Sequence, residues 1–322
     1  AAALEKGISP AQSYDSDWKI SVPMSSFRNC KGAPTGTGNW DLQNELESEK
    51  GAFDMTSALG KSINTYFAKL EEQAGLCETV TMAKKLGYER GDGKPVSDNN
   101  PSITLGGTES TPLNMAAAYA AFANRGMYCT PVAIQAITDS NGKKVTVPKS
   151  TCSRAMSEKT ADTINQMLKG VVEDGTGTQA GLTDRDNAGK TGTTNDRVDA
   201  WFVGYTPNLS TAVWVGADIG EKVPMYDITI GGQYYDKVCG GCLPGPIWRT
   251  AMTGALNASE TPSFNAVDVP RAKEKEDKEK EKDKGDDEDK GDSGKPGAGG
   301  VTVPPGTGGG HGGGRHGGGH GR

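Results

Sequence analysis

Residues 188–194 read Ala-Gly-Lys-Thr-Gly-Thr-Thr, and residues 199–207 read Asp-Ala-Trp-Phe-Val-Gly-Tyr-Thr-Pro. Thr, Trp, Phe, Val and Tyr favour strands, and the Asn-Asp-Arg at 195–197 is typical of a turn. A further short turn follows Tyr205, and strand-forming residues resume soon after it. We therefore predict an antiparallel meander of three strands, at about 187–193, 199–205 and 211–217.

The segments that flank this meander have helical patterns. Thr111 followed by Pro112 is a strong helix start, because an N-cap residue precedes proline at the first helical position. Ser157 caps another helix whose apolar residues recur at helical spacing. We also predict helices over 56–61, 65–74 and 246–256, and a hairpin that pairs 132–137 with 144–147. Helices before and after an antiparallel sheet predict an α+β fold.

Composition limits the domain organisation and the partners. The chain has 322 residues and a net charge of −6, and no basic patch interrupts its acidic body, which argues against nucleic acid as a partner. No apolar run is long enough to cross a membrane. We predict one folded domain over 1–266. A charged run and a Gly-rich end fill 267–322, which we predict to be disordered, because such a segment buries too little apolar surface to offset chain entropy.

Six cysteines suit an oxidising compartment. Our first choice for a disulfide is Cys129 with Cys152, because the predicted hairpin between them brings their ends together. Cys239 with Cys242 is the second choice. Cys239-Gly-Gly-Cys242 could also suggest zinc, but the three histidines all lie in the Gly-rich end. We therefore predict no metal and no cofactor.

Two mechanisms use Gly-Lys-Thr. A phosphate-binding loop needs a glycine five positions before the second glycine, where this chain has Asp184, and a helix rather than a strand after the lysine. The alternative is a binding strand. Lys190 would supply a positive charge for a peptide carboxylate, and Thr191 and Thr193 would supply hydroxyl groups. Gly192 would let a second backbone lie close, so that the strand edge holds an extended peptide and helps to form an oxyanion hole.

A second polar group lies at Ser62-Ile63-Asn64, in a break between two predicted helices. Ser and Asn both favour helix caps, so a purely structural role stays open. A catalytic role would use the hydroxyl of Ser62 to relay protons and the amide of Asn64 to orient a substrate carbonyl. Because the predicted body has no histidine, a Ser-His-Asp triad is excluded, and acyl transfer there must use lysine and serine.

Together these motifs resemble the penicillin-binding proteins and the class A β-lactamases, which use Ser-x-x-Lys, a Ser–Asn pair and Lys-Thr-Gly. The chain resembles the transpeptidase domain of a class A (bifunctional) penicillin-binding protein over almost all of 1–266. The match includes the block around Ser62, the helix after Thr111, the Lys190 strand with its continuation, and Pro246-Ile247-Trp248. The residue between Ser62 and Asn64 is Ile63, as in the larger wall enzymes. The resemblance implies the penicillin-binding transpeptidase fold.

The resemblance also implies a function. The parent protein would cross-link peptidoglycan stem peptides by acyl transfer from D-Ala-D-Ala, and β-lactams would bind at the same site. The domain would lie at the outer face of the cytoplasmic membrane, anchored by another segment of the parent protein. Ser62 and Lys190 would be catalytic, and the substrate would be bound by Asn64, Thr191, Gly192 and Thr193. The alternative is a non-catalytic module that binds wall peptides or β-lactams.

The nucleophile is the one motif without a good match. Ser16-Asp17-Trp18-Lys19 has the Ser-x-x-Lys pattern and precedes Ser62, but the residues after it do not read as a helix. Residues 1–7 instead resemble the later part of the nucleophile's helix. We therefore expect the nucleophile before Ala1, Ser16 being a weaker candidate. We also expect this chain to be inactive alone, with apolar surface exposed on residues 1–4.

Overall fold

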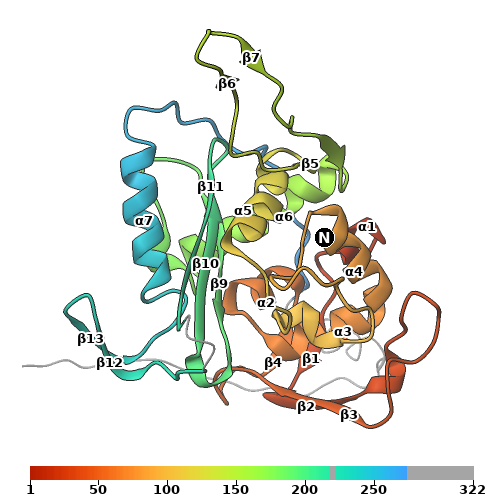
Figure 1. Ribbon diagram of the computed structural model, residues 1–322. Coiled ribbons are helices and arrows are strands. Elements are labelled where there is room, and N and C mark those ends of the chain that lie inside the picture. Colours follow the sequence, from red (N-terminus) through yellow and green to blue (C-terminus); the bar gives the residue numbers. More distant parts are fainter. Residues whose placement is uncertain (218–221, 274–322) are drawn as a thin grey trace, which may run out of the picture. The chain divides into compact units, whose positions relative to one another are not determined.

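The centre of the computed structural model is an antiparallel sheet in the order β11-β10-β9 (Figure 1). The structure describes residues 1–217 and 222–273. The predicted meander is confirmed, because each strand begins and ends within one residue or so of its expected position. The strands are β9 (Ala188–Thr193), β10 (Asp199–Tyr205) and β11 (Ser210–Gly216).

Helices cover both faces of this sheet (Figure 1). One face carries α7 (Pro244–Ala255), and the other carries α5 (Pro112–Ala123) and α6 (Glu158–Glu173). Successive side chains of β10 point to opposite faces of the sheet, so this strand contacts the helices on both sides. The Phe202 ring packs on Trp248 of α7 at 5.2 Å between centroids, whereas the Tyr205 hydroxyl donates to Asn165 Oδ1 of α6 at 2.7 Å. Gly204 is required because a Cβ there would lie 2.8 Å from the Trp248 ring.

The N-terminal half is a group of helices bordered by short strands. Thr111 and Ser157 cap their helices as predicted, and the predicted helices around residue 62 are present. The helices are α1 (Ala2–Glu5), α2 (Met55–Lys61), α3 (Asn64–Ala74) and α4 (Leu76–Lys85). The strands pair as β1 (Tyr14–Ser16) with β4 (Gly51–Phe53), and β2 (Lys19–Pro23) with β3 (Asn39–Gln43). The sequence patterns predict neither α4 nor these two ladders.

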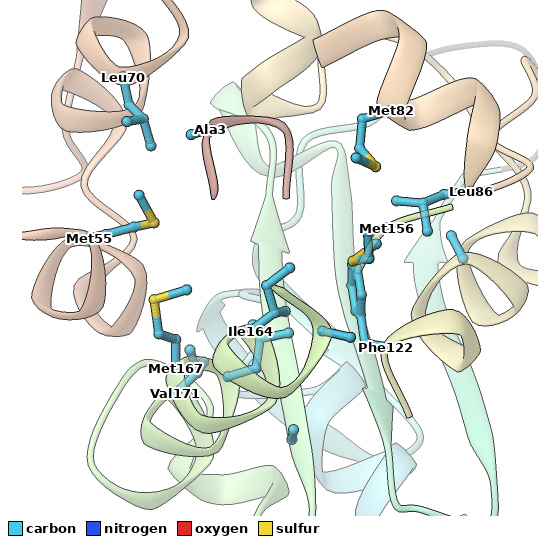
Figure 2. Close-up of a cluster of buried hydrophobic side chains, with 14 of the residues drawn as sticks. Ala3, Met55, Leu70, Met82, Leu86, Phe122, Met156, Ile164, Met167 and Val171 are labelled. Carbon is cyan, nitrogen blue, oxygen red and sulfur yellow. The ribbon is translucent and has the colours of Figure 1, made fainter. Parts of the chain in front are cut away.

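The largest cluster of buried side chains joins these helices to α6 (Figure 2). Ala3 of α1 lies in it with 6 % exposure, and Ala1, Ala2 and Leu4 are partly buried against it. The expectation of exposed apolar surface on residues 1–4 was therefore wrong. The short helix α1 places its small residues among larger side chains, including Met55, Leu70, Met82, Ile164 and Met167.

The predicted hairpin is shorter than expected. Its turn is present, since Gly142 N–H donates to the Asp139 carbonyl at 3.0 Å. Only β6 (Ile137–Thr138) and β7 (Lys144–Val145) pair, and Val132 and Ile134 are exposed outside the ladder. No further strand pairs with this ladder among the described residues, so its side chains gain little from packing. The remaining strands are β5 (Met127–Cys129), β8 (Cys152–Arg154), β12 (Tyr226–Ile230) and β13 (Gln233–Lys237), and short 3-10 helices lie at Met24–Ser26, Pro101–Leu105, Thr178–Ala180 and Asn195–Arg197.

Two disulfides are present. The first choice, Cys129–Cys152, is confirmed, and the two residues face each other across the β5–β8 ladder. Cys30–Cys77 was not predicted, because 47 residues separate its cysteines and no local pattern connects them. Cys239 and Cys242, the second choice, are free thiols in this structure.

Removing Cys30–Cys77 should destabilise the domain strongly. A disulfide restricts the unfolded chain, and the loop of 47 residues corresponds to about 4 kcal/mol. Serine at both positions should lower the free energy of unfolding by about that amount, and the 23-residue loop of Cys129–Cys152 should give a slightly smaller loss of about 3 kcal/mol. Urea unfolding measures both. A Cys30→Ser/Cys77→Ser variant as stable as the unmodified chain would refute the prediction.

Glu71 of α3 is 2 % exposed, and neither carboxyl oxygen has a hydrogen-bond partner among the described residues. Burial raises its pKa from 4.5 to about 8. The folded state therefore holds this proton while the unfolded state releases it, so stability is lost as the pH rises from about 4.5 to about 8. Glu71→Gln should become progressively more stable than the unmodified chain across this range, by up to a few kcal/mol. Melting temperatures against pH test this. Glu72→Gln, at the adjacent exposed position, is the control and should leave the pH profile unchanged.

Residues 1–273 form one compact unit, so the folded part continues past residue 266. Val269 packs against the main cluster, and Arg271 Nε and Ala272 N–H donate to Asp54 Oδ2 at 2.7 and 3.1 Å. Of the range 267–322 that is predicted to be disordered, residues 267–273 belong to this compact unit, and residues 274–322 lie outside the described residues. Within the described residues, no helix has the length and apolar composition needed to cross a membrane.

Candidate active site

Ser62 occupies the break between α2 and α3. Its backbone is left-handed, with φ 59° and ψ 44°, and its N–H closes the last turn of α2 on the Leu59 carbonyl at 3.2 Å. This conformation is uncommon for a residue with a Cβ and occurs often at functional sites. Ile63, which is fully buried, holds the break in place. The Ser62 side chain stays partly exposed.

Lys190 reaches Ser62 from β9. It pairs with Val203 of β10, so its side chain leaves the sheet on the same face as Val203. Its Nζ donates to Ser62 Oγ at 2.8 Å and to the Thr191 carbonyl at 3.0 Å. Removal from water lowers the pKa of the Lys190 ammonium to about 8. The structure thus brings together two candidate residues that lie far apart in the sequence.

Thr176, which no sequence motif identifies as a site residue, connects α2 with β9. Its N–H donates to the Gly60 carbonyl at the end of α2 at 3.0 Å, and its hydroxyl lies 2.7 Å from that of Thr191. The loop after α6 therefore holds the end of α2 against β9. Polar residues between glycines at 175–178, which read Gly-Thr-Gly-Thr, are the sequence signal that could have identified this loop.

The remaining candidates lie at the start of α3, two residues after Ser62, and along β9 after Lys190. Asn64 is the first residue of α3, and its Nδ2 donates to the Gln43 carbonyl at 2.9 Å, which leaves its side-chain oxygen available. Thr193 is exposed at the end of β9, and its Oγ1 accepts a hydrogen bond from Gly240 N–H at 3.1 Å. Among the described strands, β9 is at an edge of the central sheet. Its free side, including Gly192, can accept an additional extended chain.

Ser16 is not part of this group. It ends β1 with 1 % exposure, and its hydroxyl has no hydrogen-bond partner among the described residues. Lys19 begins β2 and is exposed. On a helix a serine and a lysine three positions apart share one face, whereas here Ser16 and Lys19 lie on separate strands that belong to different ladders. The geometry therefore gives Ser16 no adjacent base.

The α+β fold and the lysine–serine contact at a sheet edge define a protein of the penicillin-binding class. The family model for the penicillin binding protein transpeptidase domain matches residues 1–239. The chain belongs to that family.

Named relatives agree with this assignment. Penicillin-binding protein 1A of Aquifex aeolicus is 38 % identical over 190 residues, which are 59 % of this chain and 25 % of the relative. Penicillin-binding protein 1A of Mycobacterium tuberculosis is 30 % identical over 285 residues, which are 82 % of this chain and 32 % of the relative. The chain thus spans a quarter to a third of the length of these relatives. The predicted resemblance to class A members is confirmed.

Solved structures show the same fold. The penicillin-binding protein PonA1 from Mycobacterium tuberculosis aligns with a TM-score of 0.65 at 28 % identity, covering 83 % of this chain and 69 % of that one. PonA1 in complex with penicillin V aligns with a TM-score of 0.64 at 29 % identity, with the same coverage. The predicted penicillin-binding transpeptidase fold is therefore confirmed.

Proposed function

We propose that this domain, within a longer protein, cross-links peptidoglycan by acyl transfer from stem peptides that end in D-Ala-D-Ala. A serine gives its hydroxyl proton to a neighbouring base and attacks the carbonyl carbon of the penultimate D-Ala, and the terminal D-Ala leaves. An amine of a neighbouring stem peptide then takes the acyl group, and the serine recovers its proton. The observation that carries the proposal is the 2.8 Å contact of Lys190 Nζ with Ser62 Oγ. β-Lactams would acylate the same serine.

Lys190 and Ser62 form the proton path in this proposal. The Lys190 ammonium donates a proton toward Ser62 Oγ, and the Ser62 hydroxyl passes its own proton to the leaving nitrogen. A lysine with a pKa of about 8 suits this task, because it can give up and recover a proton near neutral pH. The return of the proton to Lys190 when the second amine attacks completes the cycle.

The edge of β9 holds the substrate. A peptide that adds to β9 as an extra strand places its terminal carboxylate near the Lys190 charge and the hydroxyls of Thr191 and Thr193. Asn64, which is fixed by its bond to the Gln43 carbonyl, orients a backbone amide of the substrate. The Thr193 N–H supplies one oxyanion donor, and Gly192 leaves room for the added chain.

The nucleophile in this proposal precedes residue 1 in the longer protein. The family's Ser-x-x-Lys pattern has no well-placed match in this chain, and Ser16 lies buried without an adjacent base. We propose that the domain works outside the cytoplasmic membrane, where the two disulfides, Cys30–Cys77 and Cys129–Cys152, persist. A separate segment of the longer protein would anchor it.

The decisive experiment uses a protein that carries this domain together with its preceding sequence. Release of D-Ala from a D-Ala-D-Ala peptide, followed by transfer to an added amine, is the expected result. A protein that binds the peptide but releases no D-Ala would instead be a non-catalytic wall-binding module. Acylation by labelled penicillin provides an independent second readout.

A further inference from the structure

Two free cysteines share the turn that joins β13 to α7. Cys239 N–H points to Cys242 Sγ at 2.7 Å, and Cys242 N–H points to Cys239 Sγ at 3.1 Å. The same turn is closed by a backbone bond from Cys242 N–H to the Cys239 carbonyl at 3.1 Å. Both thiols therefore lie over one turn, within reach of each other. The other four cysteines of the chain are already paired in disulfides.

Gly240 and Gly241, the two glycines of this turn, lie in contact with the candidate active site. Gly240 N–H donates to Thr193 Oγ1 at 3.1 Å, and a Cβ at Gly240 would lie 2.6 Å from the Gly192 carbonyl oxygen. A Cβ at Gly241 would lie 2.3 Å from the Thr176 carbonyl oxygen. Because the two backbones are in direct contact, a change in the turn must be transmitted to the end of β9.

The surroundings make the two thiols unequal. A hydrogen bond from the Cys242 thiol lowers the pKa of Cys239 to about 6, with help from nearby backbone N–H groups and the charge of Arg197. The same pairing raises the pKa of Cys242. Arg197 is held beside the turn by its bond to the Val238 carbonyl at 3.0 Å. A thiolate next to a protonated thiol is the arrangement of reactive Cys-x-x-Cys pairs.

A structural zinc site is the competing explanation. Zinc takes four ligands in such sites, usually from cysteine and histidine. In the described part of the chain, no group of three or more potential ligands surrounds these thiols. The pair alone is therefore better suited to thiol–disulfide exchange than to metal binding.

We propose that Cys239 and Cys242 are a reversible dithiol–disulfide pair whose state sets the contact between Gly240 and Thr193. The Cys239 thiolate attacks an external disulfide, and one thiolate leaves. Cys242 then loses its proton and attacks the Cys239 sulfur, which expels the second thiolate. Two electrons pass to the external disulfide, which becomes two thiols. Any effect of this cysteine pair on acylation rests on the function proposed above, whereas the thiol–disulfide exchange itself does not.

The first test is a redox titration of residues 1–322 in mixtures of reduced and oxidised glutathione, quenched with an alkylating agent and read by mass spectrometry. The reduced chain should gain two alkyl groups, on Cys239 and Cys242, and the oxidised chain none. As the glutathione mixture becomes more oxidising, alkylation of Cys239 and of Cys242 should disappear in a single transition. In the reduced chain, the alkylation rate of Cys239 should be half-maximal near pH 6. Thiols that stay open to alkylation at every ratio, or that titrate separately, would overturn the proposal.

The second test follows the end of β9 by hydrogen exchange. Oxidation should change the exchange of the peptide that contains Gly192 and Thr193, and Cys239→Ser/Cys242→Ser should show no response to glutathione. Unchanged exchange on oxidation would refute the coupling. Cys242→Ser alone should retain glutathione as a mixed disulfide on Cys239. Neither test uses substrate. A longer protein that titrates as expected but is never acylated would therefore contradict only the proposed function.

Discussion

A fluorescent penicillin should leave no covalent label on residues 1–322. Acylation needs an activated nucleophile, which in our proposal precedes residue 1. Ser62 relays protons in that proposal, and Ser16 is buried with no hydrogen-bond partner among the described residues. Loss of the nucleophile in an acyl-transfer enzyme typically lowers the rate on the order of 10⁶-fold, so labelling should fall below detection. The measurement is gel fluorescence after incubation, with peptide mapping of any labelled band.

The matched control is the same domain extended by its natural preceding sequence. This longer protein should carry the label on one serine that lies before Ala1, and Ser16→Ala should not change its labelling. A label on residues 1–322 that maps to Ser16 would contradict our placement of the nucleophile. It would also mean that the buried hydroxyl of Ser16, at 1 % exposure, becomes accessible when the ligand binds.

Lys190→Ala in the extended protein should slow acylation by about 10²–10⁴-fold, the usual contribution of a positioned proton carrier. The substitution removes the donor that lies 2.8 Å from Ser62 Oγ. Stopped-flow acylation with a chromogenic β-lactam separates the acylation rate from the affinity of the first complex. Lys159→Ala, at an exposed position on α6, is the matched control and should leave both values unchanged.

Lys190→Arg distinguishes the two roles proposed for the lysine. Arginine keeps the positive charge for the carboxylate but does not release its proton in proteins. The affinity should therefore be largely kept while the acylation rate falls nearly as far as in Lys190→Ala. Because the active form is the ammonium with a pKa of about 8, the acylation rate of the unmodified protein should fall as the pH rises through about 8. A Lys190→Arg variant that acylates at the full rate would mean that Lys190 serves only as a charge.

Local sequence patterns were sufficient for the elements that surround the site. Thr111-Pro112 and Ser157 identified their helices, because a helix start depends on capping by adjacent residues. The strands of the meander follow from side-chain type and from short turns, which are also local. Cys129–Cys152 also follows from a local pattern, because Cys129 ends β5 and Cys152 begins β8 after the hairpin segment between them.

Ser62 and Lys190, by contrast, could be named from the sequence but not placed together by it. Their contact depends on Thr176, which binds Gly60 and Thr191 at once, and on the pairing of Lys190 with Val203. The same dependence on tertiary structure holds for Cys30–Cys77, for the proton that burial keeps on Glu71, and for the position of Gly240 against Thr193.

The sequence by itself determined which residues could carry the chemistry and which local element each belongs to, because caps, turns and strand alternation are set by near neighbours. Only the tertiary structure decided which of those residues meet, how much water they lose and which protons they keep. Contacts between distant segments and the removal of water are properties of the packed chain, and no short window of residues contains them.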